Sequence, residues 1–197
     1  MYDAEIRPEL ISYIWSRNPK LSGLIEELPV NNGRAIADLV ALHEQPHCYE
    51  IKGSHDKVSR ALAQGVLYAT SFNKMTLVTS YKQALIAKTL LPTYWGILAV
   101  FKKPTGFEFK FIRGAKNNKD LDKALALQIL WREEMLKVAD SFEVKISPKS
   151  ANKKVISQIL ATNLTKSEIN KSISKALLSR QKALLRNKCD VTINSCF

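Results

Sequence analysis

Apolar positions follow two different periods along the first 140 residues of the chain. In some segments they recur every three to four residues, which is the period of a helix with one buried face. Between these segments lie short apolar runs of strand length. This pattern predicts an α/β fold, with helices over 3–17, 56–72, 81–91 and 121–139 and strands over 24–30, 35–42, 48–52, 74–80, 95–101 and 106–112.

Two of these strands, 35–42 and 48–52, flank a short polar loop and predict a hairpin that carries three ionisable residues, Asp38, Glu50 and Lys52. Side chains alternate across a strand, so Glu50 and Lys52 share one face. Pairing Leu42 with Cys48 places Asp38 opposite Lys52, with all three on that face. Diagonal neighbours lie roughly 7–8 Å apart at their backbones, near enough for two carboxylates to bind one ion.

Such a cluster lowers stability unless a cation or a substrate is bound, because like charges repel and lose their hydration together. Magnesium is commonly held by one or two carboxylates, which leaves its other positions for water and phosphate oxygens. A neighbouring lysine supplies positive charge where a phosphodiester gathers negative charge during attack. The hairpin therefore predicts phosphodiester hydrolysis.

The order of these residues, Asp38 followed by Glu50-Ile51-Lys52, resembles the PD-(D/E)XK nuclease superfamily. In the next helix, Gln64 and Tyr68 are four residues apart and face the same way, which resembles the Gln-x-x-x-Tyr signature of RecB-type and lambda-exonuclease-type members. The resemblance covers about residues 1–140. It implies a restriction-endonuclease-like fold, with a mixed central sheet flanked by helices and followed here by a helical C-terminal extension.

The resemblance also implies roles for individual residues. Asp38 and Glu50, with the Ile51 carbonyl, would hold Mg²⁺, for which Mn²⁺ is expected to substitute. Lys52 would orient or help to deprotonate the attacking water, and Gln64 would steady the phosphate.

Three further residues have two readings each. Glu5 resembles the acid that joins the site in small members of the superfamily, but acids are also common in the first turn of a helix. Arg34 either contacts phosphate or neutralises acids at the sheet edge. Tyr68 either contacts nucleic acid or is an ordinary residue at the edge of its helix.

The formal net charge is +12, and most of the excess lies near the C-terminus. Residues 148–188 contain ten Lys or Arg and one acid, which favours a polyanionic partner such as DNA, although a solvated helix face is the plainer explanation. Helices predicted over 153–160 and 166–186 have the arrangement of a helix-turn-helix. The expected DNA contacts are Lys153, Lys154, Lys166, Lys171 and Lys175.

Three divisions are expected along the chain: a nuclease-like core over 1–115, a helix packing on it over 119–146, and a basic extension over 147–197. An odd count of three cysteines without metal-ligand spacing favours a reduced, cytoplasmic setting. No apolar run is long enough to span a membrane. The three histidines lack zinc-ligand spacing, and neither a phosphate-binding P-loop nor a Gly-x-Ser-x-Gly motif occurs.

Together these features predict a magnesium-dependent deoxyribonuclease, in a phage-defence, mobile-element or recombination context by analogy with the superfamily. A non-catalytic DNA-binding or regulatory module of the same fold is the alternative. An RNA nuclease is a third reading, since the expected site contacts phosphate. The sequence leaves open whether the protein forms a homodimer.

Overall fold

The core of the fold is a six-stranded mixed sheet. The computed structural model describes the backbone of residues 2–194 and the side chains of residues 2–185. The strands lie in the sheet in chain order, with the three central ones parallel and the outer ones antiparallel. They are β1 (Gly23–Val30), β2 (Ala35–Leu42), β3 (His47–Lys52), β4 (Lys74–Ser80), β5 (Gly96–Lys103) and β6 (Gly106–Arg113).

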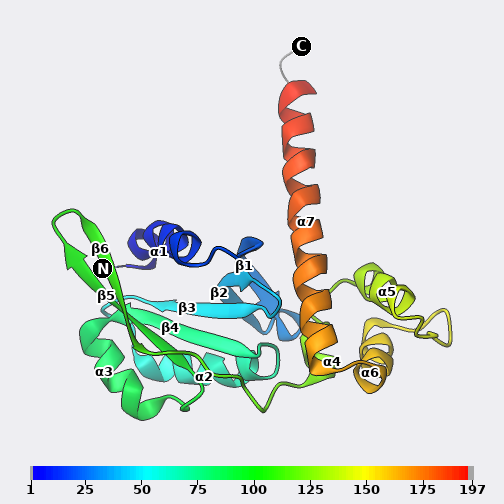
Figure 1. Ribbon diagram of the computed structural model, residues 1–197, viewed down its shortest axis with the longest axis horizontal. Coiled ribbons are helices and arrows are strands. Elements are labelled where there is room, and N and C mark those ends of the chain that lie inside the picture. Colours follow the sequence, from blue (N-terminus) through cyan, green and yellow to red (C-terminus); the bar gives the residue numbers. More distant parts are fainter. Residues whose placement is uncertain (1, 195–197) are drawn as a thin grey trace.

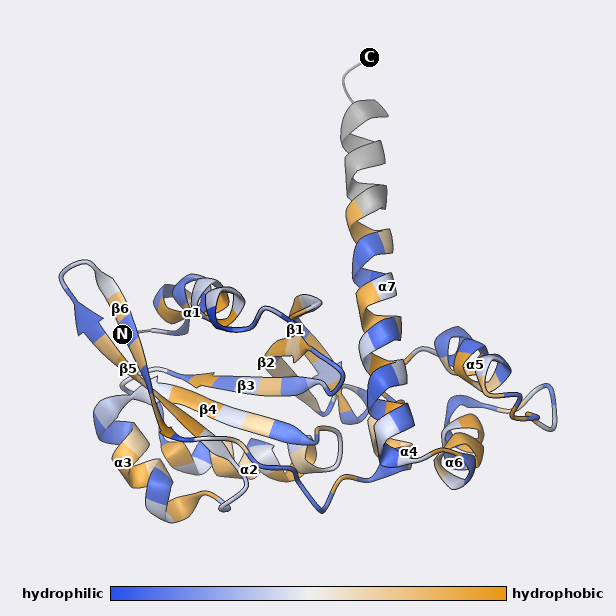
Figure 2. Cartoon of the chain, viewed as in Figure 1, coloured by the Kyte–Doolittle hydropathy of each residue, from blue (hydrophilic) through white to orange (hydrophobic). Residues whose placement is uncertain are grey.

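Helices cover both faces of the sheet (Figure 1). Parallel neighbours need a crossover, and α2 (Val58–Ala69) and α3 (Tyr81–Leu90) supply the two crossovers on one face. On the other face, α1 (Asp3–Arg17) packs through Ile6, Leu10 and Ile14. The α/β fold with a mixed, helix-flanked sheet is confirmed. Because both faces are covered, β4 and β5 are buried along most of their length, and Figure 2 shows hydrophobic segments in both strands.

The hairpin of β2 and β3 differs in register from the expected one. Val40 lies opposite Cys48 and Leu39 opposite Tyr49, so the pairing is shifted by two residues from a Leu42–Cys48 pair. The innermost pair is Ala41 with His47, so the turn between paired residues lies one position earlier than expected. A shift of two keeps each side chain on its face, whereas a shift of one would have reversed the faces.

The prediction of a single helix over 121–139 was wrong, because this segment forms two helices, α4 (Lys123–Leu127) and α5 (Arg132–Ser141). The reason is a second helix start: the backbone N–H of Trp131 donates to the Glu134 carboxylate at 2.7 Å. The Glu134 side chain thereby caps the N-terminus of a new helix, as the acid of a capping box does.

Two more helices, α6 (Lys153–Asn163) and α7 (Lys166–Asn194), follow as expected. Ile169, Ile173 and Leu177 of α7 pack in the same hydrophobic cluster as α2 and β2, while the later part of α7 extends away from the sheet (Figure 1). The C-terminal extension therefore shares a hydrophobic core with the sheet and with α2.

The described residues can be searched for a membrane-spanning helix and for paired cysteines. No helix in residues 2–194 is both long and apolar enough to cross a membrane. Cys48 is a buried, free thiol, and Cys189 and Cys196 lie outside the described side chains.

Candidate functional site

The candidate site lies where the pairing of β2 and β3 ends. The last paired residues are Leu39 and Tyr49. Beyond them the backbone N–H of Ile51 donates to Oδ2 of Asp38, at 2.7 Å. The Asp38 side chain thus takes the place of a backbone acceptor and is fixed between the two strands.

The alternation of β2 also breaks at Asp38. Ala37 packs in the cluster on the α2 face and Leu39 in the cluster on the α1 face, although residues two apart in a regular strand share a face. On the neighbouring strand, Glu27 has a φ of 51°, a left-handed conformation that is uncommon for a residue other than glycine. This irregularity frees Asp38 from the regular pleat and lets its carboxylate turn toward β3.

Glu50 and Lys52 share one face of β3, as expected. Glu50 has 0% exposure and Lys52 has 8%. The Lys52 ammonium donates to Oε1 of Glu50, while Oε2 of Glu50 is buried without a hydrogen-bond partner. Burial, together with the nearby Asp38 carboxylate, raises the pKa of Glu50 to about 7 despite the Lys52 charge. Burial raises the pKa of Asp38 as well.

The α2 helix brings Gln64 and Tyr68 to this region. The Tyr68 hydroxyl donates to the Ile36 carbonyl oxygen at 2.7 Å, and the Gln64 amide nitrogen lies 3.5 Å from the same hydroxyl. Oε1 of Gln64 is buried without a partner. Tyr68 is fully buried, so the structure gives it a supporting role in place of the expected contact with nucleic acid.

A shallow hollow of about 510 Å³ opens beside Asp38 and Gln64, and Asp3, Arg7 and Arg34 also line it. The Arg7 guanidinium donates to the Asp38 carbonyl oxygen at 2.9 Å and to Oδ2 of Asp3 at 2.6 Å. Oδ1 of Asp3 is buried without a partner. Arg34 is thus placed where a phosphate could enter.

Asp3, and not Glu5, is the acid that α1 brings to the hollow. The Glu5 carboxylate accepts from the Tyr2 backbone N–H at 2.7 Å and lies 3.8 Å from the Lys102 ammonium. It caps the helix and does not line the hollow. Of the two interpretations of Glu5, the structure supports the acid in the first turn of a helix. The helical period indicates Asp3 as the acid near the hollow, because Asp3 and Arg7 are one turn apart on one face.

Two of the five C-terminal lysines expected to contact DNA make intramolecular contacts instead. Lys153 donates to the Gln128 carbonyl oxygen at 2.6 Å, and Lys166 donates to the Lys119 carbonyl oxygen at 3.0 Å. Both ammonium groups tie the C-terminal helices to the preceding segment. A role in stability accounts for both side chains.

Lys166 is nevertheless exposed, and so are the other three lysines. Lys171 lies 3.8 Å from Glu44, and Lys154 and Lys175 also point to solvent. These lysines lie on α6 and α7, which are joined by only Leu164 and Thr165. The linker is shorter than the four-residue turn expected over 161–164.

The donor set at the hairpin suits a hard cation. Asp38 and Glu50 supply carboxylate oxygens, and one oxygen of Glu50 is buried with nothing to accept from, which is a costly arrangement unless a ligand completes it. Among the described residues no group of three or more His, Cys, Asp or Glu could hold a metal ion. Two carboxylates would leave the other positions of such an ion to water, which is how Mg²⁺ is commonly bound.

Comparison with known proteins gives a family for the chain. The model of the family described as bacteriophage P4 protein cII matches residues 1–195. The protein cII of Enterobacteria phage P4 is 21% identical over 182 residues, which is 92% of this chain and 68% of that protein. Among solved structures, a protein of unknown function from Silicibacter pomeroyi aligns with a TM-score of 0.39 at 18% identity, over 66% of this chain and 82% of that one.

Proposed function

The chain belongs to the family of bacteriophage P4 protein cII, and we propose that it is a divalent-metal-dependent nuclease that hydrolyses phosphodiester bonds in DNA. The observation that carries this proposal is Glu50: a fully buried acid with one unpartnered oxygen, held beside Asp38 and Lys52. A buried carboxylate of this kind costs stability, and perturbed acids gather where they bind or react. A PD-(D/E)XK kinship and a restriction-endonuclease-like arrangement are part of the same proposal.

The residues have separate roles in this proposal. Asp38, Glu50 and the Ile51 carbonyl would hold Mg²⁺, with Mn²⁺ as a substitute, and a bound divalent ion would supply a more acidic water and screen phosphate charge. Lys52, which donates to Glu50, holds that carboxylate in place and orients the attacking water. Gln64 presents its amide to the phosphate from the hollow.

DNA is the proposed substrate because positive and hydrogen-bonding groups surround the hollow. Arg34 lines it next to Asp38, and the C-terminal region contributes a large positive charge that attracts a polyanion. A phage or mobile-element setting fits the family, and a cytoplasmic site of action follows from a DNA substrate. A homodimer, with each copy cutting one strand, belongs to the same proposal.

Cleavage of supercoiled plasmid, linear duplex, single-stranded DNA and RNA, with Mg²⁺ or Mn²⁺, tests the proposal. We expect cleavage of DNA that chelation abolishes and that Asp38→Asn, Glu50→Gln and Lys52→Gln each reduce by about 100-fold or more. Glu44→Gln is the matched control, because Glu44 is an exposed acid at the other end of the same hairpin. Absence of cleavage on every substrate, or full activity of the Asp38 and Glu50 variants, contradicts it.

The alternative is a non-catalytic DNA-binding module, and one observation favours it. Both acids already have cationic neighbours, since Lys52 pairs with Glu50 and Arg7 lies 3.9 Å from Asp38. In a non-catalytic module, Lys52 and Arg7 would stabilise the charges of Glu50 and Asp38, and no metal would be needed. The same variants would then bind DNA as the unaltered protein does, with no cleavage by any of them.

A further inference from the structure

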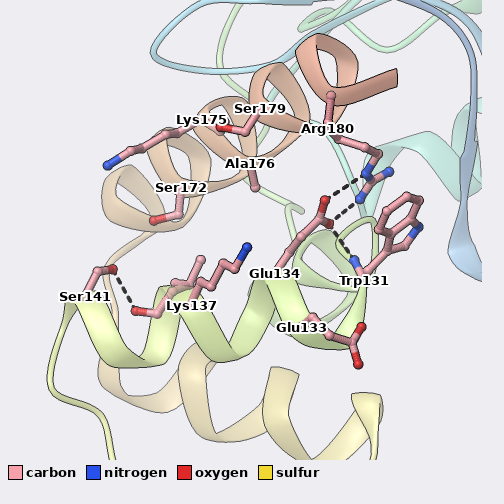
Figure 3. A pocket seen from close by; sticks show the side chains of 12 residues that line it. Trp131, Glu133, Glu134, Lys137, Ser141, Ser172, Lys175, Ala176, Ser179 and Arg180 are labelled. Carbon is pink, nitrogen blue, oxygen red and sulfur yellow. Dashed lines mark hydrogen bonds and ion pairs between the residues drawn. The ribbon is translucent and has the colours of Figure 1, made fainter. Parts of the chain in front are cut away.

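A second hollow, a groove of about 490 Å³, lies between α5 and α7 (Figure 3). Its walls combine a tryptophan, basic side chains and an apolar floor that includes Val138 and Ala176. Figure 1 shows α5 and α7 at the opposite side of the molecule from the start of α1, where Asp3 and Arg7 flank the candidate site. The two hollows are separate features.

The tryptophan of this groove, Trp131, is exposed and held in place. Arg180 lies over the Trp131 ring, 4.2 Å from its centroid. Arg180 is itself fixed, because its guanidinium donates to both carboxylate oxygens of Glu134 and to the Ile129 carbonyl oxygen. Even so, 53% of Trp131 is exposed. A rigid aromatic ring with an open side is a ready stacking surface.

The charges around the ring are arranged for an anion. Glu134 is neutralised by Arg180, and Figure 3 shows the Glu133 carboxylate on the side of α5 turned away from α7. Lys137 reaches from α5 toward α7, and Lys175 extends outward from α7. Both lysines are exposed, so two ammonium groups remain available along the groove.

We propose that this groove binds a single strand of nucleic acid, with one base stacked on Trp131 and the phosphates beside it contacted by Lys137 and Lys175. Aromatic rings and basic side chains along one groove are how proteins hold single strands without reading sequence. The apolar floor receives the sugars and the faces of neighbouring bases. Duplex DNA fits poorly, because its bases are stacked inside the helix. The proposal rests on these contacts and not on nuclease activity.

Anisotropy of a fluorescein-labelled oligothymidine tests the proposal, measured on the full chain in EDTA so that metal-dependent cleavage cannot interfere. Trp131→Ala is expected to weaken binding by about fivefold or more, the loss of one stacked base. Trp131→Phe is expected to retain most of the affinity. Trp15→Ala is the matched control, because Trp15 is 48% exposed on α1, far along the chain from the groove, and its removal should leave binding unchanged.

The lysines give a second, independent readout. Lys137→Gln combined with Lys175→Gln should lower the slope of log affinity against log salt by about 1.4, since each phosphate contact in a single strand contributes about 0.7. Equal binding by Trp131→Ala and Trp15→Ala, with both variants folded by circular dichroism, overturns the proposal. Tighter binding of polyglutamate than of oligothymidine also overturns it and identifies the groove as a surface for an acidic protein segment.

Discussion

Replacing Glu50 by glutamine should change how the stability of the protein depends on pH. Burial raises the pKa of Glu50 from 4.5 to about 7, so the folded protein keeps this proton to a higher pH than the unfolded chain does. Between about pH 4.5 and 7 the unfolded chain releases the proton first. The stabilisation that this proton contributes is therefore fully present below the pKa of Glu50 in the unfolded chain. It is lost as the pH rises through the pKa of Glu50 in the folded protein.

The size of the effect follows from the shift. A difference of about 2.5 pKa units corresponds to about 3 kcal/mol of unfolding free energy, which the unaltered protein loses between about pH 4.5 and pH 8. The side chain at position 50 of the Glu50→Gln variant cannot ionise, so this variant does not lose that free energy as the pH rises. The variant leaves Lys52 without its anionic partner at every pH, so it is the change with pH, and not the absolute stability, that isolates Glu50.

Urea unfolding at pH 4.5, 6, 7 and 8 in the presence of EDTA measures this directly. The unfolding free energy of Glu50→Gln, minus that of the unaltered protein, should rise by about 3 kcal/mol across the series. Glu44→Gln should give a constant difference, because Glu44 has 82% of its side chain exposed. If the unfolding free energies of Glu50→Gln and the unaltered protein change with pH in the same way, the Glu50 carboxyl does not hold its proton to a higher pH in the folded protein.

Two substitutions in α2 test the packing behind the site by thermal or urea unfolding. Tyr68→Phe removes the hydroxyl that donates to the Ile36 carbonyl and should cost about 1 kcal/mol, and an unchanged stability would show that this contact contributes nothing. Gly65→Ala would place a Cβ 2.6 Å from Cζ2 of the buried Trp95 ring and should cost about 1–3 kcal/mol. Gly114→Ala, which meets no atom within 4 Å, should not show that loss, and equal losses would contradict the close approach.

The shared face of Glu50 and Lys52 could be predicted because a strand has a period of two. Glu50 and Lys52 must share a face whatever the register, and the residues that pair across the hairpin change only which side chain each one meets. The register itself depended on the position of the turn, which the polar residues around Pro46 left undetermined. The break in β2 at Asp38 had no sequence signal, and it lies beside Glu27 of the neighbouring strand, whose φ of 51° is also irregular.

Tertiary contacts decided the points that sequence reasoning missed. The apolar pattern through 121–139 is nearly continuous, yet the chain turns at Ile129 and Leu130, which are buried in the core, and Glu134 caps a new helix. Lys153 and Lys166 look like other surface lysines in the sequence. Their carbonyl partners lie in segments 25 and 47 residues away, so only the fold distinguishes them from lysines open to a ligand.

Calorimetric titration of Mg²⁺ and Mn²⁺ into the folded protein tests whether Asp38 and Glu50 bind a metal ion, and it does not require the substrate to be known. We expect binding by the unaltered protein and by Glu5→Gln, and loss of binding in Asp38→Ala and Glu50→Ala, with all variants confirmed to be folded. Binding that is absent from the unaltered protein, or that persists unchanged in both the Asp38 and the Glu50 variant, would show that the hairpin acids do not form a metal site.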